Sequence, residues 1–197
     1  MTEKCSCGKN DAILENGMYT LCYECRNKLL SVSSYLNSAN IPYNAQKFSL
    51  DNFDSEKVKK IFQLTNKLRT NIILSGESYC GKTTLLCSLY KFVVERAKKK
   101  PSGLFVNVPN LIYNTVYEIK DLVQPDILIL DDYINTTNEK AYWLLYNSLN
   151  LRAEKEKVTW TSTNLTDIKD SRLKSRLLRM GGNWINVTKD IQSNEKV

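Results

Sequence analysis

The chain has 197 residues, of which 42% are hydrophobic and 25% are charged, as in an ordinary soluble globular protein. It contains no histidine, which excludes a Ser-His-Asp triad and every metal site that needs a histidine ligand. The formal net charge of +7 arises in residues 46–197, where 24 basic side chains face 17 acidic ones. This charge is compatible with nucleic acid as a partner, although many soluble proteins are basic for solubility alone.

The N-terminal residues lack the apolar core and the small-residue cleavage site of a signal peptide. No apolar stretch approaches the ~20 residues that are needed to span a bilayer. We therefore expect a cytoplasmic protein with no membrane partner.

Four of the six cysteines lie within the first 25 residues, in the pattern C-x-C, fourteen residues, C-x-x-C. They are Cys5, Cys7, Cys22 and Cys25. Disulfides are disfavoured in a cytoplasmic protein, so two cysteine pairs separated by a loop indicate a metal site. Four thiolates suit a structural Zn²⁺ ion, with no open position left for catalysis. An iron–sulfur cluster takes the same ligands, and four free thiols are the other alternative.

Two short apolar runs, 12–14 and 18–21, flank Asn16-Gly17, which is a strong two-residue hairpin signal. A segment this short cannot bury a core of its own, so bound metal must supply its stability. The sequence therefore predicts a small zinc ribbon-like module.

A helix is expected to follow the second cysteine pair, over residues 26–36. The polar residues after it, which end in a proline, are typical of a linker. We divide the chain into a zinc-binding module (1–40), a linker (41–46) and a main domain (47–197).

The segment Gly-Glu-Ser-Tyr-Cys-Gly-Lys-Thr matches the phosphate-binding loop pattern G-x-x-x-x-G-K-[ST] at every required position. Gly76 and Gly81 allow the backbone to turn its N–H groups toward the phosphates of a nucleoside triphosphate. Lys82 would reach the β- and γ-phosphates, and the Thr83 hydroxyl would complete the Mg²⁺ shell.

The residues on either side of this loop supply the context that the motif needs. An apolar run at 71–75 predicts a buried strand, and apolar residues at helical spacing predict a helix over 82–99. The positive end of that helix adds to the phosphate site. A chance match in a glycine-containing turn is the alternative. The predicted nucleotide contacts are Gly76, Glu77, Ser78, Tyr79, Cys80, Gly81, Lys82, Thr83 and Thr84.

An acidic element at 125–132 consists of an apolar run that ends in two aspartates. This pattern predicts a buried parallel strand that delivers carboxylates to its C-terminal edge, where ligands bind in open α/β sheets. Asp131 would hold Mg²⁺, directly or through water, and Asp132 would polarise the attacking water.

Further strands are expected at 104–108, 157–164 and 184–187, and further helices at 138–153 and 166–180. Strands that alternate with helices favour the α/β class, with a parallel sheet flanked by helices.

In this order the segments resemble the AAA+ ATPases of the DnaC/DnaI helicase-loader and IstB transposition-helper group. The resemblance covers residues 46–180 and is carried by Phe48-Ser49-Leu50-Asp51-Asn52-Phe53, the Gly-Lys-Thr loop, Ile129-Leu130-Asp131-Asp132, Asn150-Leu151-Arg152, Thr161-Ser162-Thr163-Asn164-Leu165 and Lys174-Ser175-Arg176-Leu177. It implies a P-loop AAA+ domain with a five-stranded parallel sheet that hydrolyses ATP with Mg²⁺.

The resemblance also implies roles for single residues. Asn164 would sense the γ-phosphate and help to orient water, although an asparagine here could also cap the following helix. Arg176 is the best candidate for an arginine finger that reaches a neighbouring subunit's γ-phosphate, and Arg172 is the second. The alternative for both is a solvated or DNA-facing basic helix surface. Arg152 is expected to face a neighbouring subunit as well.

Most AAA+ proteins carry a helical lid with a sensor arginine after the core. Only fifteen residues follow Gly182, and none of them is arginine. We therefore expect a reduced or absent C-terminal lid.

The function implied by the resemblance is ATP-dependent loading of the replicative hexameric DNA helicase. The protein would form a homo-oligomer with ATP and contact single-stranded DNA, while its zinc module binds the helicase or another partner. One alternative is an IstB-type transposition helper that binds duplex DNA. Another is a nucleotide-latched adaptor with negligible hydrolysis. The compact chain is compatible with a phage or mobile-element version.

Overall fold

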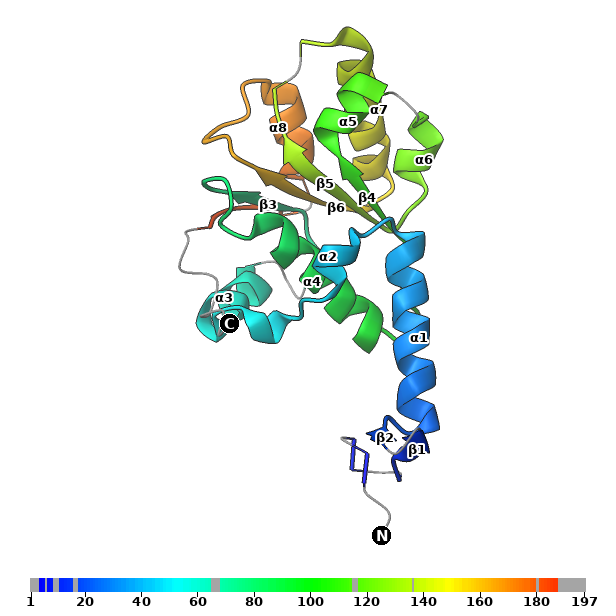
Figure 1. Cartoon of the computed structure of the whole chain (residues 1–197). Coiled ribbons are helices and arrows are strands. Elements are labelled where there is room, and N and C mark those ends of the chain that lie inside the picture. The colour runs from blue at the N-terminus through cyan, green and yellow to red at the C-terminus, as the bar shows by residue number, and fades with distance from the viewer. Residues whose placement is uncertain are drawn as a thin grey trace.

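The computed structural model describes residues 4, 5, 7, 8, 11–15, 18–64, 68–114, 117–135, 137–179 and 181–187. A hairpin near the N-terminus leads into a long helix, and this helix runs into an α/β core (Figure 1). The elements in chain order are β1 (Ile13–Glu15), β2 (Met18–Thr20), α1 (Tyr23–Ser38), α2 (Tyr43–Gln46), the short 3₁₀ turn η1 (Leu50–Asn52), α3 (Ser55–Leu64), β3 (Ile72–Ser75), α4 (Lys82–Arg96), β4 (Gly103–Asn107), α5 (Val108–Asn114), α6 (Ile119–Val123), β5 (Ile127–Tyr133), α7 (Glu139–Glu154), β6 (Val158–Thr163), α8 (Ser171–Leu177) and β7 (Asn183–Asn186).

The core sheet has five strands in the order β4-β5-β6-β3-β7, and every neighbouring pair is parallel. This confirms the predicted fold class, a parallel five-stranded sheet flanked by helices. The strand that precedes the phosphate-binding loop, β3, lies between β6 and β7. Because parallel strands place their carboxyl ends at one edge, the loop after β3 and the residues that end β5 and β6 come together there.

The alternation of side chains along β3 explains why both faces of the sheet are covered. Ile72 and Leu74 point to one face and pack with Leu85 of α4, while Ile73 points to the other and packs with Leu145 of α7. All three strand residues are fully buried, and each such side chain contributes roughly 1.5–3 kcal/mol to stability. Figure 1 shows the corresponding layers, with α1 to α4 on one side of the sheet and α5, α7 and α8 on the other.

The C-terminal half of α1 and the segment after it pack on the core. The backbone N–H of Phe105 donates to Ala39 O at 2.7 Å, and Lys91 Nζ donates to Gln46 O at 3.0 Å. Lys100 Nζ also donates to Ser31 Oγ at 2.6 Å. These bonds tie α1 and α2 to the edge strand β4 and to α4. The division of the chain into a module, a linker and an ATPase domain stays a prediction.

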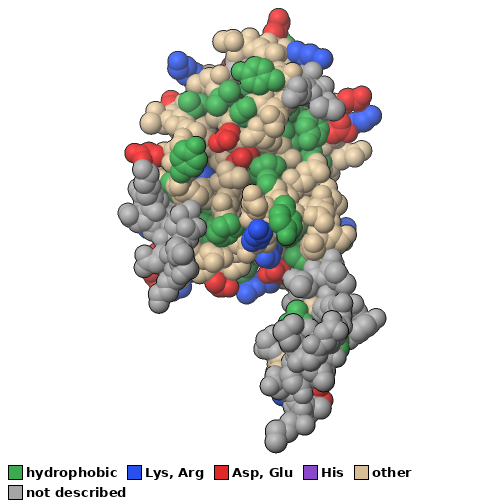
Figure 2. Space-filling model, in the orientation of Figure 1, with side chains coloured by type: hydrophobic (Ala, Val, Ile, Leu, Met, Phe, Trp, Pro, Cys, Tyr) green, Lys and Arg blue, Asp and Glu red, His purple; other side chains and the backbone are tan. Residues whose placement is uncertain are grey.

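The described chain ends at Val187, directly after β7, so the prediction of a reduced or absent lid concerns residues outside the described part. Among the described residues, no helix combines the length and the hydrophobicity needed to cross a membrane. Hydrophobic, acidic and basic side chains are interspersed on the face of the core that Figure 2 shows.

Arg152, in the last turn of α7, is only 1% exposed, so the expectation that it faces a neighbouring subunit is wrong. Its guanidinium donates to Thr159 Oγ1 and to the backbone carbonyl oxygens of Leu122, Pro125, Asp126 and Val158. Arginine alone offers five N–H donors in a fixed planar group, which suits this cluster of acceptors where β5 and β6 begin. Burial lowers the pKa of Arg152 to about 10, which leaves it charged at neutral pH.

Arg152→Met is therefore expected to lower the free energy of unfolding by about 3 kcal/mol or more, because it leaves several buried acceptors without a donor. Urea denaturation followed by circular dichroism measures this. The matched control is Lys155→Met, at the exposed end of the same helix, which should change stability by no more than about 0.5 kcal/mol. A loss below about 1 kcal/mol for Arg152→Met would contradict a structural role.

Candidate nucleotide-binding and metal sites

Two glycines shape the phosphate-binding loop. Gly76 has a φ of +153°, and a Cβ atom there would lie 2.2 Å from the backbone oxygen of Val187. Gly81 has a φ of +87° and is the N-cap of α4. Neither position accepts a side chain without strain or a clash, so both glycines are needed for the turn from β3 into α4. The first turn of α4 therefore points its free N–H groups toward the loop.

Lys82 is the best-connected side chain of the loop, and it is only 5% exposed. Its Nζ donates to the carbonyl oxygens of Gly76 at 3.0 Å and Glu77 at 2.6 Å, and to Asn164 Oδ1 at 2.8 Å. The ammonium group is thus held by uncharged acceptors that directly follow the ends of two strands, β3 and β6. Phosphate oxygens make stronger, charge-assisted bonds than these carbonyls, so a triphosphate would replace them as partners of Lys82.

A carboxylate and two hydroxyl groups meet next to this lysine. Thr83 Oγ1 and Ser162 Oγ both donate to Asp131 Oδ1, each at 2.6 Å. A hydroxyl beside a carboxylate is the donor set that P-loop ATPases use for Mg²⁺. Thr83 and Asp131 therefore fit the predicted magnesium site.

Ser162 is a site residue that sequence reasoning missed. The pairing of β5 with β6 shifts register between Leu130 and Tyr133, so β5 carries one extra residue there. Ser162 faces this irregularity, and its Oγ also accepts the backbone N–H of Asp132 at 3.0 Å. A serine inside an apolar strand gives no signal by itself, because its role depends on the register of the neighbouring strand.

Asp132 has a strained backbone and an unfavourable electrostatic environment. Its φ is +52°, in the left-handed region that non-glycine residues seldom adopt. Partial burial raises the pKa of its carboxyl group, the charge of Asp131 raises it further, and Lys82 opposes the shift. Strain of this kind collects at functional sites, where it holds a reactive group in position.

Asp132→Asn is expected to increase stability while it lowers ATP turnover. The raised pKa means that the folded protein disfavours the charged carboxylate, so a neutral amide removes a cost that grows as the pH rises above the unfolded-state pKa and is complete above the folded-state pKa. Asparagine also tolerates a positive φ better than most residues. The gain, measured as the difference in urea-unfolding free energy at pH 7, should be a few tenths to about 1 kcal/mol, since solvent screens a partly exposed group.

The pH dependence provides the control for this prediction. The stability difference between Asp132→Asn and wild type should shrink as the pH falls through the pKa of Asp132, because the wild-type carboxyl group then becomes neutral as well. If the stability difference stayed constant from pH 7 down to pH 4, the gain would come from the backbone conformation alone and not from the loss of the charge.

These side chains line a cleft of about 430 Å³ at the carboxyl edge of the sheet, a size suited to a small ligand. The cleft is lined by Ser78, Tyr79, Gly81, Lys82, Thr83, Thr84, Asp132 and Asn164. Tyr79 is 98% exposed at its rim, whereas Cys80 is buried beneath the loop. Asn164 does not cap the next helix, because Asp170 is the N-cap of α8 and accepts the N–H groups of Arg172 and Leu173.

The two arginines predicted to act on a neighbouring subunit lie on α8, and neither lines the cleft. Arg172 is exposed, pairs with Asp170, and lies over the rings of Tyr142 and Tyr146. Arg176 is half-buried, and its Nε donates to Asn150 Oδ1 of α7 at 2.8 Å. Their location outside the cleft of their own chain is what a role in trans requires, and that role stays a prediction.

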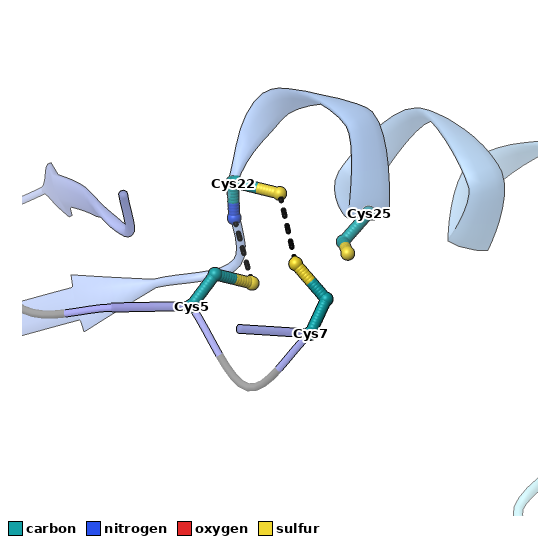
Figure 3. Close-up of side chains that lie close together, drawn as sticks. All are labelled: Cys5, Cys7, Cys22 and Cys25. Carbon is teal, nitrogen blue, oxygen red and sulfur yellow. Dashed lines mark hydrogen bonds between the residues drawn. The ribbon is translucent and has the colours of Figure 1, made fainter. Parts of the chain in front are cut away.

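The four N-terminal cysteines converge at the start of α1 (Figure 3), where all four Sγ atoms lie within 4.8 Å of one another. Cys5 and Cys22 are buried, and the sulfurs of Cys7 and Cys22 are 3.9 Å apart. Zn–S bonds of ~2.3 Å in a tetrahedron place the sulfurs roughly 3.8 Å apart, so a small contraction of this cluster would accommodate the ion. The all-sulfur donor set fits structural zinc.

Backbone N–H groups around the cluster favour the deprotonated, thiolate form of Cys5. The N–H of Cys22 donates to Cys5 Sγ at 3.3 Å, and this bond leads a set that lowers the pKa of Cys5 to about 6. Gly8 N donates to Cys5 O at 2.8 Å, which closes a tight turn that contains the first cysteine pair. Backbone N–H groups stabilise sulfur charge, as expected for a metal-binding turn.

No protein-family model and no curated protein matches the sequence. Solved structures do match the fold. The DnaC helicase loader aligns over 75% of this chain and 100% of its own, with a TM-score of 0.56 and 18% identity. DnaI aligns over 75% of this chain and 94% of its own, with a TM-score of 0.63 and 18% identity.

A replication initiator, DnaA bound to AMPPCP and single-stranded DNA, aligns over 72% of this chain and 50% of its own. Its TM-score is 0.52 and its identity is 22%. At such low identity these likenesses show the fold and leave the activity open. The chain therefore shares its α/β fold with DnaC and DnaI, and with about half of the DnaA chain.

Proposed function

We propose that this protein is an ATP-dependent loader of the replicative DNA helicase. The observation that carries the proposal is the convergence of Lys82, Thr83, Asp131, Asp132 and Asn164 at one edge of a sheet whose fold is shared with DnaC and DnaI. The cysteine cluster at the N-terminal end of α1 supports the proposal, because a metal-bound module there would give the protein a second binding surface.

We infer a task for each residue of the cleft from its position. The loop N–H groups and Lys82 would bind the β- and γ-phosphates, and Asn164 would exchange its bond with Lys82 for one to the γ-phosphate or the attacking water. Thr83 and Asp131 would hold Mg²⁺, and the ion would supply positive charge that offsets the charge of the phosphates. Asp132 orients the attacking water and accepts its proton.

Arg176 of one subunit would complete the site of the next, which makes turnover depend on a homo-oligomer. Single-stranded DNA is the proposed nucleic-acid ligand, as it is bound in the DnaA structure. The net charge of +7 favours that contact, which should weaken with salt. The hairpin of β1 and β2 lies away from the core at the N-terminal end of α1 (Figure 1), and with the neighbouring cysteine cluster it would bind the helicase.

Co-purification from the native host tests this function. The tagged full chain should retain a hexameric helicase in the presence of ATP, and Lys82→Ala should retain less of it. A Lys155→Ala variant is the matched control, because that lysine is exposed and lies outside the cleft. Recovery of a transposase and duplex DNA in place of a helicase would favour the IstB-type alternative. Helicase capture without any ATP turnover would favour the latched adaptor.

A further inference from the structure

The predicted arginine finger is held by a second side chain that motif reasoning did not assign. Asn150 lies one turn from the end of α7, and its Oδ1 accepts the Nε–H of Arg176 at 2.8 Å. Its Nδ2 in turn donates to Glu154 Oε1 at 2.7 Å, one helical turn further along α7. Two consecutive hydrogen bonds therefore connect the guanidinium of Arg176 to Asn150, and Asn150 to Glu154.

The chemistry of Glu154 determines which way the amide points. An ionised carboxylate only accepts hydrogen bonds, so it selects the orientation in which the NH₂ group of Asn150 faces it. The amide oxygen is then left facing α8, where Arg176 offers only N–H donors. Both ends of the amide are satisfied in this orientation, and a flipped amide would lose both bonds.

The backbone of Arg176 is fixed as well. The buried side chain of Asn71 donates from Nδ2 to Arg176 O at 3.4 Å, and its Oδ1 accepts the N–H of Thr159 at 2.7 Å. Asn71 directly precedes β3, the strand that leads into the phosphate-binding loop. The end of α8 is therefore tied to the central strands of the sheet.

The bond to Asn150 uses the one inner donor of the guanidinium and leaves the outer edge available. Nε carries one N–H, and the two terminal nitrogens carry the other four. Among the described residues, no other side chain hydrogen-bonds or ion-pairs with this guanidinium. The two terminal nitrogens form the edge of the guanidinium that can bind two phosphate oxygens at once.

From this geometry we propose that Asn150 is a positioning residue for Arg176, and that Glu154 fixes the orientation of its amide. The inference rests on the proposed function, because it assumes that Arg176 acts on the nucleotide of a neighbouring subunit. It adds that Asn150 holds the side chain of Arg176 in its working orientation before the neighbouring subunit binds. Positioning of this kind is worth about 10- to 100-fold in rate when the held group acts in the transition state.

The test uses full-length protein and steady-state ATP turnover with single-stranded DNA present. Asn150→Ala should lower kcat by about 10-fold or more while the Kd for ATP and the thermal midpoint stay near wild type. Asn147→Ala, one turn earlier in α7, is the matched control and should retain wild-type kcat. The double variant Asn150→Asp/Glu154→Gln reverses the donor and acceptor between α7 positions and keeps an acceptor for Nε, so it should recover most of the lost kcat.

Mixing experiments separate positioning from a general loss of structure. A Lys82→Ala subunit has a defective nucleotide site but an intact finger, so it should restore turnover when mixed with Arg176→Ala subunits. Asn150→Ala subunits should be rescued in the same way, because their nucleotide sites are intact. A subunit that is merely misfolded would not be rescued.

Two negative results have different meanings. If Arg176→Ala loses turnover but Asn150→Ala retains it, the positioning role is overturned and the proposed function stands. If Arg176→Ala itself turns over ATP like wild type, or if wild type shows no turnover, the finger assignment fails and the inference falls with it.

Discussion

Lys82→Ala is expected to reduce ATP turnover by roughly 10²- to 10³-fold, the usual consequence of removing one fixed charge from a transition state. The lysine is almost completely buried, and it bridges the loop to Asn164 across the carboxyl edge of the sheet. No other lysine or arginine lines the cleft, within the part of the chain that the structure describes. A substitution here therefore leaves the terminal phosphates without a cationic side chain from their own subunit.

Nucleotide binding should fall less than turnover, because the loop N–H groups and the first turn of α4 remain in place. Isothermal titration with a non-hydrolysable ATP analogue and a coupled turnover assay measure the two effects separately. Lys155→Ala serves as the charge-matched control and should behave as wild type in both assays. Turnover within threefold of wild type for Lys82→Ala would contradict the assignment of this loop.

The sequence allowed the parts of this site that are local in the chain to be predicted. The loop from Gly76 to Thr83 is such a part, since each fixed residue acts within one strand-to-helix turn. The run of apolar residues before Asp131 likewise predicts a buried strand that ends in two aspartates. Neither prediction needs knowledge of which strands are neighbours.

Residues whose roles depend on a neighbouring element escaped prediction. Ser162 serves Asp131 only because β6 lies beside β5 and a register shift brings the two together. Asn150 holds Arg176 only because α7 packs against α8. A sequence shows the periodicity of each element but not the register or the packing angle between two of them.

Arg152 shows the opposite error, in which a general rule misleads. Charged side chains are almost always exposed, so an arginine on a helix is reasonably expected to face solvent or a partner. Here the start of β5 and β6 presents several carbonyl oxygens that need donors, and one guanidinium satisfies them together. The requirement for those donors became visible only once the strands were placed.

Removal of zinc is expected to unfold the N-terminal module and leave the α/β core folded. The hairpin of β1 and β2 has three residues in each strand, too few to be stable alone, so the metal must supply the energy. Structural zinc gives roughly 10–16 kcal/mol of apparent binding energy in small modules of this kind. The C-terminal half of α1 is held independently by its packing on α4 and β4, for example through the bond from Phe105 to Ala39.

Cys22→Ser tests this most directly, because Cys22 is the N-cap of α1 and its backbone N–H donates to Cys5 Sγ. The variant should lose its bound metal, measured by mass spectrometry of the native protein, together with helicase capture, while its ATP affinity stays unchanged. Cys87→Ala is the matched control, since Cys87 is buried within α4, apart from the cluster, and burial raises the pKa of its thiol well above the usual range. That variant should keep one zinc ion per chain.

The measured metal also separates zinc from the alternatives that the ligand set permits. An iron–sulfur cluster would give visible absorption bands that zinc lacks, and four free thiols would react with a thiol reagent before any chelator is added. If Cys22→Ser kept both its metal and its helicase, the cluster would not be the module's source of stability, and the partner surface would have to lie on the ATPase core. The cysteine cluster lies beside the N-terminal end of α1, which extends away from the core (Figure 1), whereas the nucleotide cleft lies in the core at the carboxyl edge of the sheet. The loss of one site without the other is the result that this separation requires.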